Sequence, residues 1–125
     1  MAKVSGLTTT LTVASNNISN DVTSLTVDTP YGVQDVTGLD KSAMERLLLR
    51  ADCTGSATGV FNTASNMSHA TLKTPGSKTT VIAFPGATLT FTAVWTNYNV
   101  SMGADGSLVW SCNWALSSGT AAAWT

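Results

Sequence analysis

The sequence predicts a mainly β fold: a β-sandwich or barrel-like structure with one short flanking helix and one long inter-strand loop. Apolar residues alternate with threonine and serine at a period of two in several segments, which is the pattern of half-buried strands. A Pro-Gly pair at 85–86 and an Ala-Asp-Gly-Ser turn at 104–107 separate such segments. The length of 125 residues suits one domain, 1–125.

The first two strands are expected to form a hairpin. Leu7, Leu11 and Val13 alternate with threonines, and an Asn- and Asp-rich turn follows at 16–21. Residues 22–28 form the next alternating run, so the two runs on either side of the turn predict a β-hairpin. The segment 28–41 then contains a proline and two glycines, and we expect it to be a long loop.

Residues 42–53 have two interpretations. Ser42 and Glu45 have the spacing of a helix capping box, and the composition favours a helix. At a period of two, however, Leu47, Leu49 and Ala51 share one face with Cys53. We prefer the strand, because a helix would spread three consecutive leucines over a wide arc.

A short helix is expected within 62–74. Thr63 or Ser65 is suitable as its N-cap, Ala64, Met67 and Thr71 have helical spacing, and a Pro-Gly pair at 75–76 ends it. The only histidine, His69, lies in this polar segment, and we expect it to be a solvated surface residue.

The C-terminal half shows the clearest strand pattern. Residues 81–84 are expected to form a strand before the turn at 85–86. The strand that follows is predicted to place Leu89, Phe91, Ala93 and Trp95 on one face. The last long strand is predicted to place Leu108, Trp110, Cys112 and Trp114 on one face.

The charge content excludes several classes of function. Only 10% of the residues are charged, against about 25% in a typical domain, and the net charge is −1. No basic patch is available for gripping phosphates, and no apolar run is long enough to span a membrane, so we expect no membrane insertion. The N-terminus lacks the pattern of a signal peptide, so export is not expected. So few charges favour a subunit of a larger assembly, although a small β domain with a hydroxyl-rich surface is the alternative.

The candidate reactive residues do not form a catalytic or metal-binding set. Asp28, Asp35 and Asp40 are too widely spaced for a Ca²⁺ loop, and no aromatic platform near them supports a glycosidase. One histidine and two cysteines are too few for a zinc site. Cys53 and Cys112 are expected to be buried thiols in preference to a disulfide. We therefore predict no enzyme activity, no catalytic or metal-binding residue and no cofactor.

The tryptophans divide into two groups. Trp95, Trp110 and Trp114 lie on the apolar faces of predicted strands and are expected in the core, with ligand stacking as the alternative. Trp124 is close to the C-terminus, where residues are poorly ordered unless a contact holds them. Docking on a neighbouring subunit would supply such a contact.

The motifs together resemble one family. The order is TVDTPYG, a loop ending in DVTGLD, a leucine-rich strand closing in ADCTG, the strand pair VIAFPGATLTF and the closing segment NVSMGADGSLVWSCNWALSSGTAAAW. Over residues 7–124 this pattern resembles the major tail (tail tube) proteins of long-tailed bacteriophages. The resemblance implies a structural virion protein of the phage tail, assembled in the host cytoplasm, with six copies per ring and four strands per copy lining the tube. The helix at 64–72 would lie outside or between subunits.

The resemblance also implies partners and an interface. The partners would be other copies of the chain and other tail proteins (tape measure, terminator and distal tail), and DNA would pass through the lumen without specific binding. The loop 28–41 would dock on a neighbouring copy, mobile before assembly and ordered after it, with Tyr31 and Leu39 as anchors. The tail 120–125 would form a second contact. The expected interface residues are Asp28, Thr29, Pro30, Tyr31, Asp35, Val36, Leu39 and Asp40 in the loop, and Ala122 and Trp124 in the tail.

Two other functions fit the same composition. A capsid decoration or head–tail connector protein would also be small and rich in β-structure. A carbohydrate-binding β-sandwich module would use Trp124 or Tyr98 as a platform for sugar rings.

Overall fold

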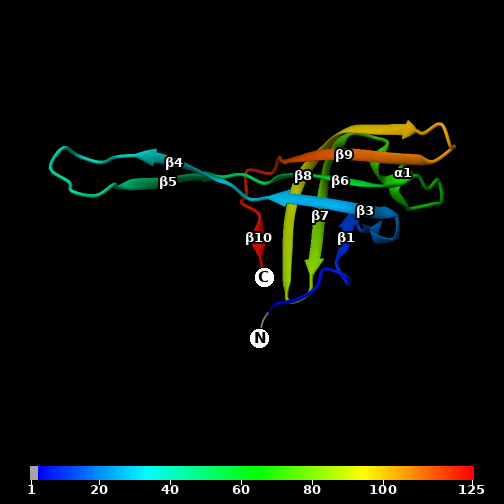
Figure 1. Ribbon diagram of the computed structural model, residues 1–125, viewed down its shortest axis with the longest axis horizontal. Helices are drawn as coiled ribbons and strands as arrows, with labels where there is room; N and C mark the ends of the chain where they lie inside the picture. Colours follow the sequence, from blue (N-terminus) through cyan, green and yellow to red (C-terminus); the bar gives the residue numbers. More distant parts are fainter. Residues whose placement is uncertain (1–2) are drawn as a thin grey trace.

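A computed structural model describes residues 3–125, and the first two residues of the expected domain lie outside this range. Alternating threonine and apolar residues form long strands as predicted, and the fold is mainly β with one short α-helix in the described residues (Figure 1). The elements are β1 (Thr10–Val13), β2 (Asn16–Asn17), the 3₁₀ helix η1 (Ser19–Asp21), β3 (Val22–Asp28), β4 (Tyr31–Asp35), β5 (Arg46–Ala51), β6 (Thr54–Val60), α1 (Ser68–Leu72), β7 (Gly76–Phe84), β8 (Ala87–Met102), β9 (Leu108–Leu116) and β10 (Ala123–Trp124).

The long strand β8 connects two layers of one curled antiparallel sheet. The strand order is β2-β1-β7-β8-β9-β6-β3, with β10 also paired to β8. The first part of β8 pairs with β7 up to Trp95, and its last part pairs with β9 from Ala93 onward. A bulge between Thr96 and Asn99 bends the strand, so that β7 crosses β9, β6 and β3 steeply (Figure 1). We call β3, β6, β9 and the last part of β8 the four-stranded layer.

The core lies between the two layers. Leu89, Phe91, Ala93 and Trp95 are buried as predicted, and so are Trp110, Cys112 and Trp114, whereas Leu108 lies at the end of β9 and is partly exposed. The other buried apolar residues are Leu11, Val13, Ile18, Cys53, Ala57, Leu72 and Ile82. Both cysteines are free thiols, which confirms the prediction of buried thiols. Burial raises the pKa of Cys112 to about 11 and also raises the pKa of Cys53.

The short helix is positioned by a buried carboxylate from another part of the chain. Asp21 accepts hydrogen bonds from the Ser68 backbone N–H at 3.1 Å and from Asn62 Nδ2 at 3.0 Å. The helix therefore begins at Ser68, and the predicted start near 62–65 is wrong, because a distant carboxylate caps the helix in place of Thr63 or Ser65.

His69 differs from the solvated residue that we expected. Its ring is half-buried, with its centroid 4.9 Å from that of Phe61, and its Nδ1 is 3.2 Å from the Tyr98 hydroxyl. Tyr98 in turn lies next to Trp110 at 6.2 Å between centroids. The helix thus covers the inner face of the β8–β9 hairpin, and His69 is part of that packing.

Two predictions about strand pairing are wrong. The expected hairpin between the first two runs does not form, because β1 pairs with β2 and β7 whereas residues 22–28 pair with β6. The segment 28–41 is also not one loop. It contains the end of β3 and all of β4, which pairs with β5. The preferred strand interpretation of 42–53 is confirmed by β5.

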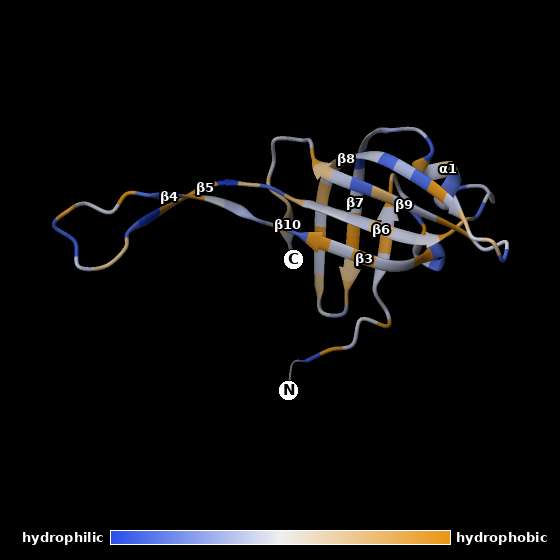
Figure 2. Cartoon of the chain, turned by 45° about the horizontal axis from the view of Figure 1, so that its top comes forward, coloured by the Kyte–Doolittle hydropathy of each residue, from blue (hydrophilic) through white to orange (hydrophobic). Residues whose placement is uncertain are grey.

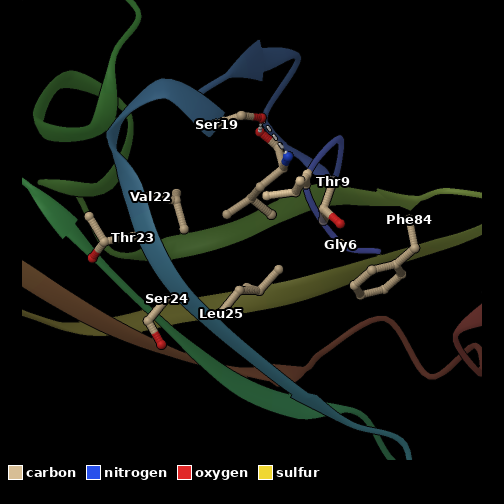
Figure 3. A pocket seen from close by; sticks show the side chains of 10 residues that line it. Gly6, Thr9, Ser19, Val22, Thr23, Ser24, Leu25 and Phe84 are labelled. Carbon is tan, nitrogen blue, oxygen red and sulfur yellow. Dashed lines mark hydrogen bonds between the residues drawn. The ribbon is translucent and has the colours of Figure 1, made fainter. Parts of the chain in front are cut away.

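A groove of about 480 Å³ lies where the curled sheet stays open. It is bounded by β3 on one side and by the N-terminal segment and Phe84 on the other (Figure 3). The Leu11 N–H donates to Ser19 Oγ at 2.7 Å at its edge. None of the residues in 3–125 that line the groove has a titratable side chain, so these residues offer no acid, base or nucleophile of low pKa.

Candidate assembly surfaces

The segment between β3 and β6 forms a two-stranded arm, residues 30–51, that extends away from the two layers (Figure 1). It continues the direction of β3 and β6 beyond the end of the four-stranded layer (Figure 1). At its base the Asp52 N–H donates to the Pro30 carbonyl oxygen at 2.8 Å. An isolated two-stranded hairpin is only marginally stable in water.

Local hydrogen bonds shape the distal turn of the arm. The hydroxyl of Thr37 donates to Asp35 Oδ1 at 2.6 Å and accepts from the Glu45 N–H at 2.8 Å. The Thr37 N–H also donates to Asp35, and these bonds hold the pKa of the Asp35 carboxyl below its usual value. The Val36 N–H donates to the Glu45 carbonyl oxygen at 2.9 Å. Asp35 thus makes its hydrogen bonds within the arm itself.

Both faces of the arm carry exposed apolar side chains. Tyr31 and Val33 lie on one face of β4, where Val33 pairs with Leu48. Leu47 and Leu49 lie on the other face, where a Cβ added at Gly32 would be 3.2 Å from Leu49 Cβ. All of these large side chains are at least 48% exposed, and Leu39 at the tip is fully exposed. Figure 2 shows hydrophobic residues, in orange, along the arm. Exposed apolar clusters of this kind mark interaction surfaces.

The arm and the residues at its base, 28–52, contain most of the charges of the chain. Residues 28–52 include three of the six Lys and Arg residues and five of the seven Asp and Glu residues. These are Asp28, Asp35, Asp40, Lys41, Glu45, Arg46, Arg50 and Asp52. The rest of the chain has only five charged residues, so the hydroxyl-rich alternative describes the layered body and not the arm.

The predicted interface residues are distributed along this arm and its base. Asp28 ends β3 opposite Thr54, and Tyr31 and Asp35 are the first and last residues of β4. Leu39 and Asp40 lie exposed in the distal turn. Thr29, Pro30 and Val36 occupy the base and the start of the turn. The sequence interpretation missed the exposed leucines of β5, although apolar residues at consecutive positions of a strand already indicate that both of its faces are apolar.

The C-terminal tail is held by its own chain. Ala123 and Trp124 pair with Thr90 and Leu89 of β8, and the Trp124 ring stacks on Phe84 at 6.0 Å. Ala122 packs against the core, while Trp124 stays 50% exposed. The contact that orders the tail is thus intramolecular, and the free face of Trp124 is available for a partner.

The two central rows on the outer face of the four-stranded layer are neutral and polar. Directly paired residues share a face of a sheet, so the register defines complete rows across the layer. One row is Ser24, Thr58, Ser111 and Asn99, and the next is Thr26, Ser56, Asn113 and Thr96. Asp28, at one corner of the face, is the single charged residue in these four strands.

The four-stranded layer has two free edges in the described residues. On one side β3 pairs only with β6. On the other side β7 leaves β8 at Trp95, so the last part of β8 pairs only with β9. Unpaired strand edges are templates for pairing with another chain.

A second apolar cluster lies at the far end of the molecule from the arm, around the turn between β8 and β9 (Figure 1). We call it the β8–β9 end patch. Its members are Val60, Val100, Met102, Leu108 and Val109, each at least 36% exposed. Val109 pairs with Val60 on the outer face of the layer, whereas Met102 and its partner Leu108 lie on the opposite face with Val100, so this end of the sheet exposes apolar side chains on both faces.

The described residues contain no group of three His, Cys, Asp or Glu side chains that could hold a metal ion. No helix in residues 3–125 is long and apolar enough to cross a membrane. Tyr98 is half-buried beside His69 and so does not offer the free platform that a sugar ring would need.

No protein-family model matches the sequence, and no curated protein matches it. The fold is similar to that of solved chains at low sequence identity. A chain in the virion of a native gene transfer agent particle has a TM-score of 0.81 and 15% identity, over 98% of this chain and 99% of that chain. A chain in the tail of an empty gene transfer agent particle with C6 symmetry has a TM-score of 0.69 and 17% identity, over 84% and 82% of the two chains. A chain in the six-fold symmetrised baseplate of the anti-feeding prophage has a TM-score of 0.60 and 11% identity, over 100% and 96%. This protein therefore shares its fold with components of phage-like particles.

Proposed function

We propose that this protein is a structural subunit of a phage-like tail, whose copies close into six-membered rings that stack into a DNA-conducting tube. The likeness in fold to chains of a six-fold symmetric tail and a six-fold baseplate supports this proposal. The observation that carries it is the four-stranded layer, which has a free edge on each side and a neutral polar outer face.

The strand directions of the layer are compatible with ring closure. Each neighbouring pair from β8 to β9, β6 and β3 is antiparallel, so β8 and β3 run in opposite directions. Copies related by rotation about an axis along the strands keep these directions. The edge of β8 in one copy can therefore pair antiparallel with β3 of the next, and repetition closes a barrel without free edges.

The outer face of this layer is suited to the wall of a DNA channel. Serine, threonine and asparagine form its two central rows, and its only charge is the carboxylate of Asp28. Cationic side chains would bind phosphates by releasing counterions, and every such contact would hold the DNA. A neutral wall stays hydrated and lets the polymer slide. DNA would thus pass without specific binding.

The arm and the tail would supply the contacts between copies. Tyr31, Leu39 and the leucines of β5 would leave water when the arm docks on a neighbour, and this burial would offset the cost of ordering it. Trp124, which stacks on Phe84, would contact a neighbour through its exposed face, and the adjacent Ala122 would complete the contact of the tail. The arm is thus expected to be mobile in a free copy and ordered in the assembly. Tape measure, terminator and distal tail proteins would contact the finished tube.

Negative-stain electron microscopy of the purified protein tests this proposal. The expected result is a set of stacked rings or tubes with six-fold symmetry and a central hole. A protein that remains a dispersed monomer at high concentration would contradict the proposal. The same sample, compared by hydrogen exchange before and after assembly, should show protection appearing in the arm.

Removal of the arm provides the matched control. Deletion of residues 28–41 would remove β4 and leave β5 without its pairing strand. A better variant replaces the whole of residues 31–51 with a short glycine-serine turn. Pro30 and Asp52, which this turn would connect, are already joined by a hydrogen bond. This variant should fold with unchanged thermal unfolding but form no tube.

A ring subunit of a baseplate is the second candidate. The likeness to a chain of the anti-feeding prophage baseplate, which covers this whole chain, favours it specifically. Such a subunit would form single six-fold rings, whereas a tube subunit would form particles of variable length. The length distribution in the same micrographs separates the two functions.

A further inference from the structure

We propose that the last part of β8 in one copy closes the groove of the next copy, with Val100 and Met102 as the side chains that fill it. This inference rests on the proposed function, because it uses the pairing of β8 with β3 that closes the ring. It assigns the groove of Figure 3 to that contact. The occupant of the groove is thus a second copy of the same chain.

The groove opens along the unpaired edge of β3. Val22 and Leu25 line it from β3, and Leu11 and Phe84 line it from the other layer. Both β7 and the N-terminal segment extend past the free edge of β3 (Figures 1 and 2). The other layer therefore continues beyond β3, where no further strand from residues 3–125 lies beside β3 to cover it. A strand added to β3 would cover this part of the layer and fill the groove.

The inner face of the last part of β8 has apolar side chains that its own chain leaves uncovered. The helix α1 covers this face near Tyr98, which contacts His69. Further along the strand, Val100 is 39% exposed and Met102 is 71% exposed. These two residues are the inner-face members of the β8–β9 end patch that lie on the free edge of β8. Burial of both side chains would contribute to pairing at this edge.

Pairing of the two edges would direct these side chains into the groove. A strand that pairs with an edge continues the sheet, so its side chains stay on their own faces. Val22 and Val100 belong to one inner-face row, which passes through Gly59 and Trp110. Rotation about an axis along the strands does not change height, so this row of one copy meets the same row of the next. Val100 would then lie next to Val22, with Met102 further along the groove.

The lengths of the two edges agree with this register. On the free side β8 has no partner after Trp95, where β7 leaves it, and β3 has seven residues. Thr26 shares its row with Thr96, so β3 can pair along the free part of β8. Asp28 shares the next row with Val94, whose place on that side is already taken by Ser77 of β7. The strand β3 thus ends where β7 would block further pairing.

Cysteine pairs test the register. Ser24→Cys combined with Asn99→Cys places two thiols at opposite edges of one exposed row. Oxidation should link the copies into covalent multimers of up to six on a non-reducing gel, and the buried Cys53 and Cys112 do not compete. Thr26→Cys combined with Asn99→Cys is the matched control. One step along a face is about 7 Å, which puts the Cα atoms beyond the reach of a disulfide, so the yield should be about tenfold lower.

An aspartate in the groove tests the apolar contact. Val100→Asp should lower the fraction of protein that sediments as rings by about tenfold or more, because the carboxylate would lose its water in an apolar site. Its thermal unfolding as a monomer should be unchanged, since Val100 is exposed in a single copy. Val109→Asp is the matched control, because Val109 is 40% exposed and lies on the outer face of the same layer. This variant should keep its rings.

The outcomes separate this inference from the proposed function. Rings that form equally well with Val100→Asp, or links that form equally with both cysteine pairs, would overturn the groove contact and leave the tube function intact. Loss of rings in both aspartate variants would also overturn the assignment, because a charge on either face would then block assembly. Wild-type protein that stays monomeric would overturn the tube function, and the groove contact with it.

Discussion

The indole of Trp114 lies directly over Gly55 of the neighbouring strand β6, and a Cβ at that glycine would overlap Trp114 Cζ2 and the Thr26 carbonyl oxygen. Gly59 has the same relationship to Trp110, whose Cζ2 would be 2.9 Å from an added Cβ. The two glycines therefore make room for two tryptophans in a thin core. The Trp114 ring also contacts Trp95 at 4.7 Å between centroids.

Gly55→Ala should destabilise the fold by about 1–3 kcal/mol, because the indole or β3 must move to admit the methyl group. The measurement is urea unfolding followed by tryptophan fluorescence. Gly6→Ala is the matched control, since its Cβ would make only an ordinary contact of 3.5 Å with Thr9 Oγ1. Equal stability of the two variants would show that the tryptophan packing tolerates a side chain at Gly55.

Thr80→Val should cost about 1–3 kcal/mol of unfolding free energy. The buried Trp95 Nε1–H donates to Thr80 Oγ1 at 2.9 Å, and valine would leave this donor without a partner. Thr79→Val, at an exposed position of the same strand, should change stability by about 0.5 kcal/mol or less. If both variants unfold at the same urea concentration, the hydrogen bond between Trp95 and Thr80 makes no measurable contribution to the free energy of unfolding.

Stability should fall as the pH rises from about 9 to about 11. Burial raises the pKa of Cys112 from 9.0 to about 11, so the unfolded chain loses the thiol proton at a lower pH than the folded chain. The stabilisation is complete below pH 9 and disappears as the pH passes the folded pKa, with a slope of up to about 1.4 kcal/mol per pH unit. Urea unfolding at several pH values measures the slope.

Cys112→Ala is the control for this pH dependence. The variant should be less stable at neutral pH because it leaves a cavity, but its stability should fall less steeply in alkali. Some slope should remain, because the pKa values of Cys53 and Tyr98 are also raised by burial. An unchanged slope would exclude Cys112 as its source.

Asn113→Lys should make assembled tubes retain DNA. Asn113 is exposed in the second polar row of the four-stranded layer, so the substitution would place a ring of cations in the lumen. Retention should weaken steeply with salt, as expected for phosphate contacts. The measurement is the amount of DNA that sediments with the tubes.

Thr79→Lys makes the same change of charge on the other layer. Tubes of the Thr79→Lys variant should retain far less DNA in the lumen than tubes of the Asn113→Lys variant. Equal retention by the two variants would mean that the four-stranded layer does not face the channel.

Much of the fold was predictable because strand periodicity is local. The alternation in residues 87–95 and 108–114 identified the buried face of β8 and most of that of β9, and the turns at 85–86 and 104–107 are where predicted, with Gly86 and Gly106 at positive φ. The burial of both cysteines and of three tryptophans followed from the same pattern. In these segments each residue needs only its neighbours in the chain to define its face.

The pairing of strands was not predictable, because partners are chosen by contacts between distant segments. Residues 22–28 were assigned to a hairpin with the preceding run, but they pair with β6, about 30 residues later. The start of α1 depends on Asp21, 47 positions from Ser68. Neither contact leaves a signal in the local sequence.

The sequence by itself determined that the chain is rich in β-structure, that it has few charges, and that the segment after residue 28 is unusual. The tertiary structure alone decided what that segment is. Pairing between β4 and β5 turns an expected loop into an arm, and its distance from the core leaves Leu47, Leu48 and Leu49 in water. Apolar side chains of the strands in the body are buried, whereas those of β5 in the arm are exposed. The difference arises because burial depends on whether another layer packs against that face of the strand.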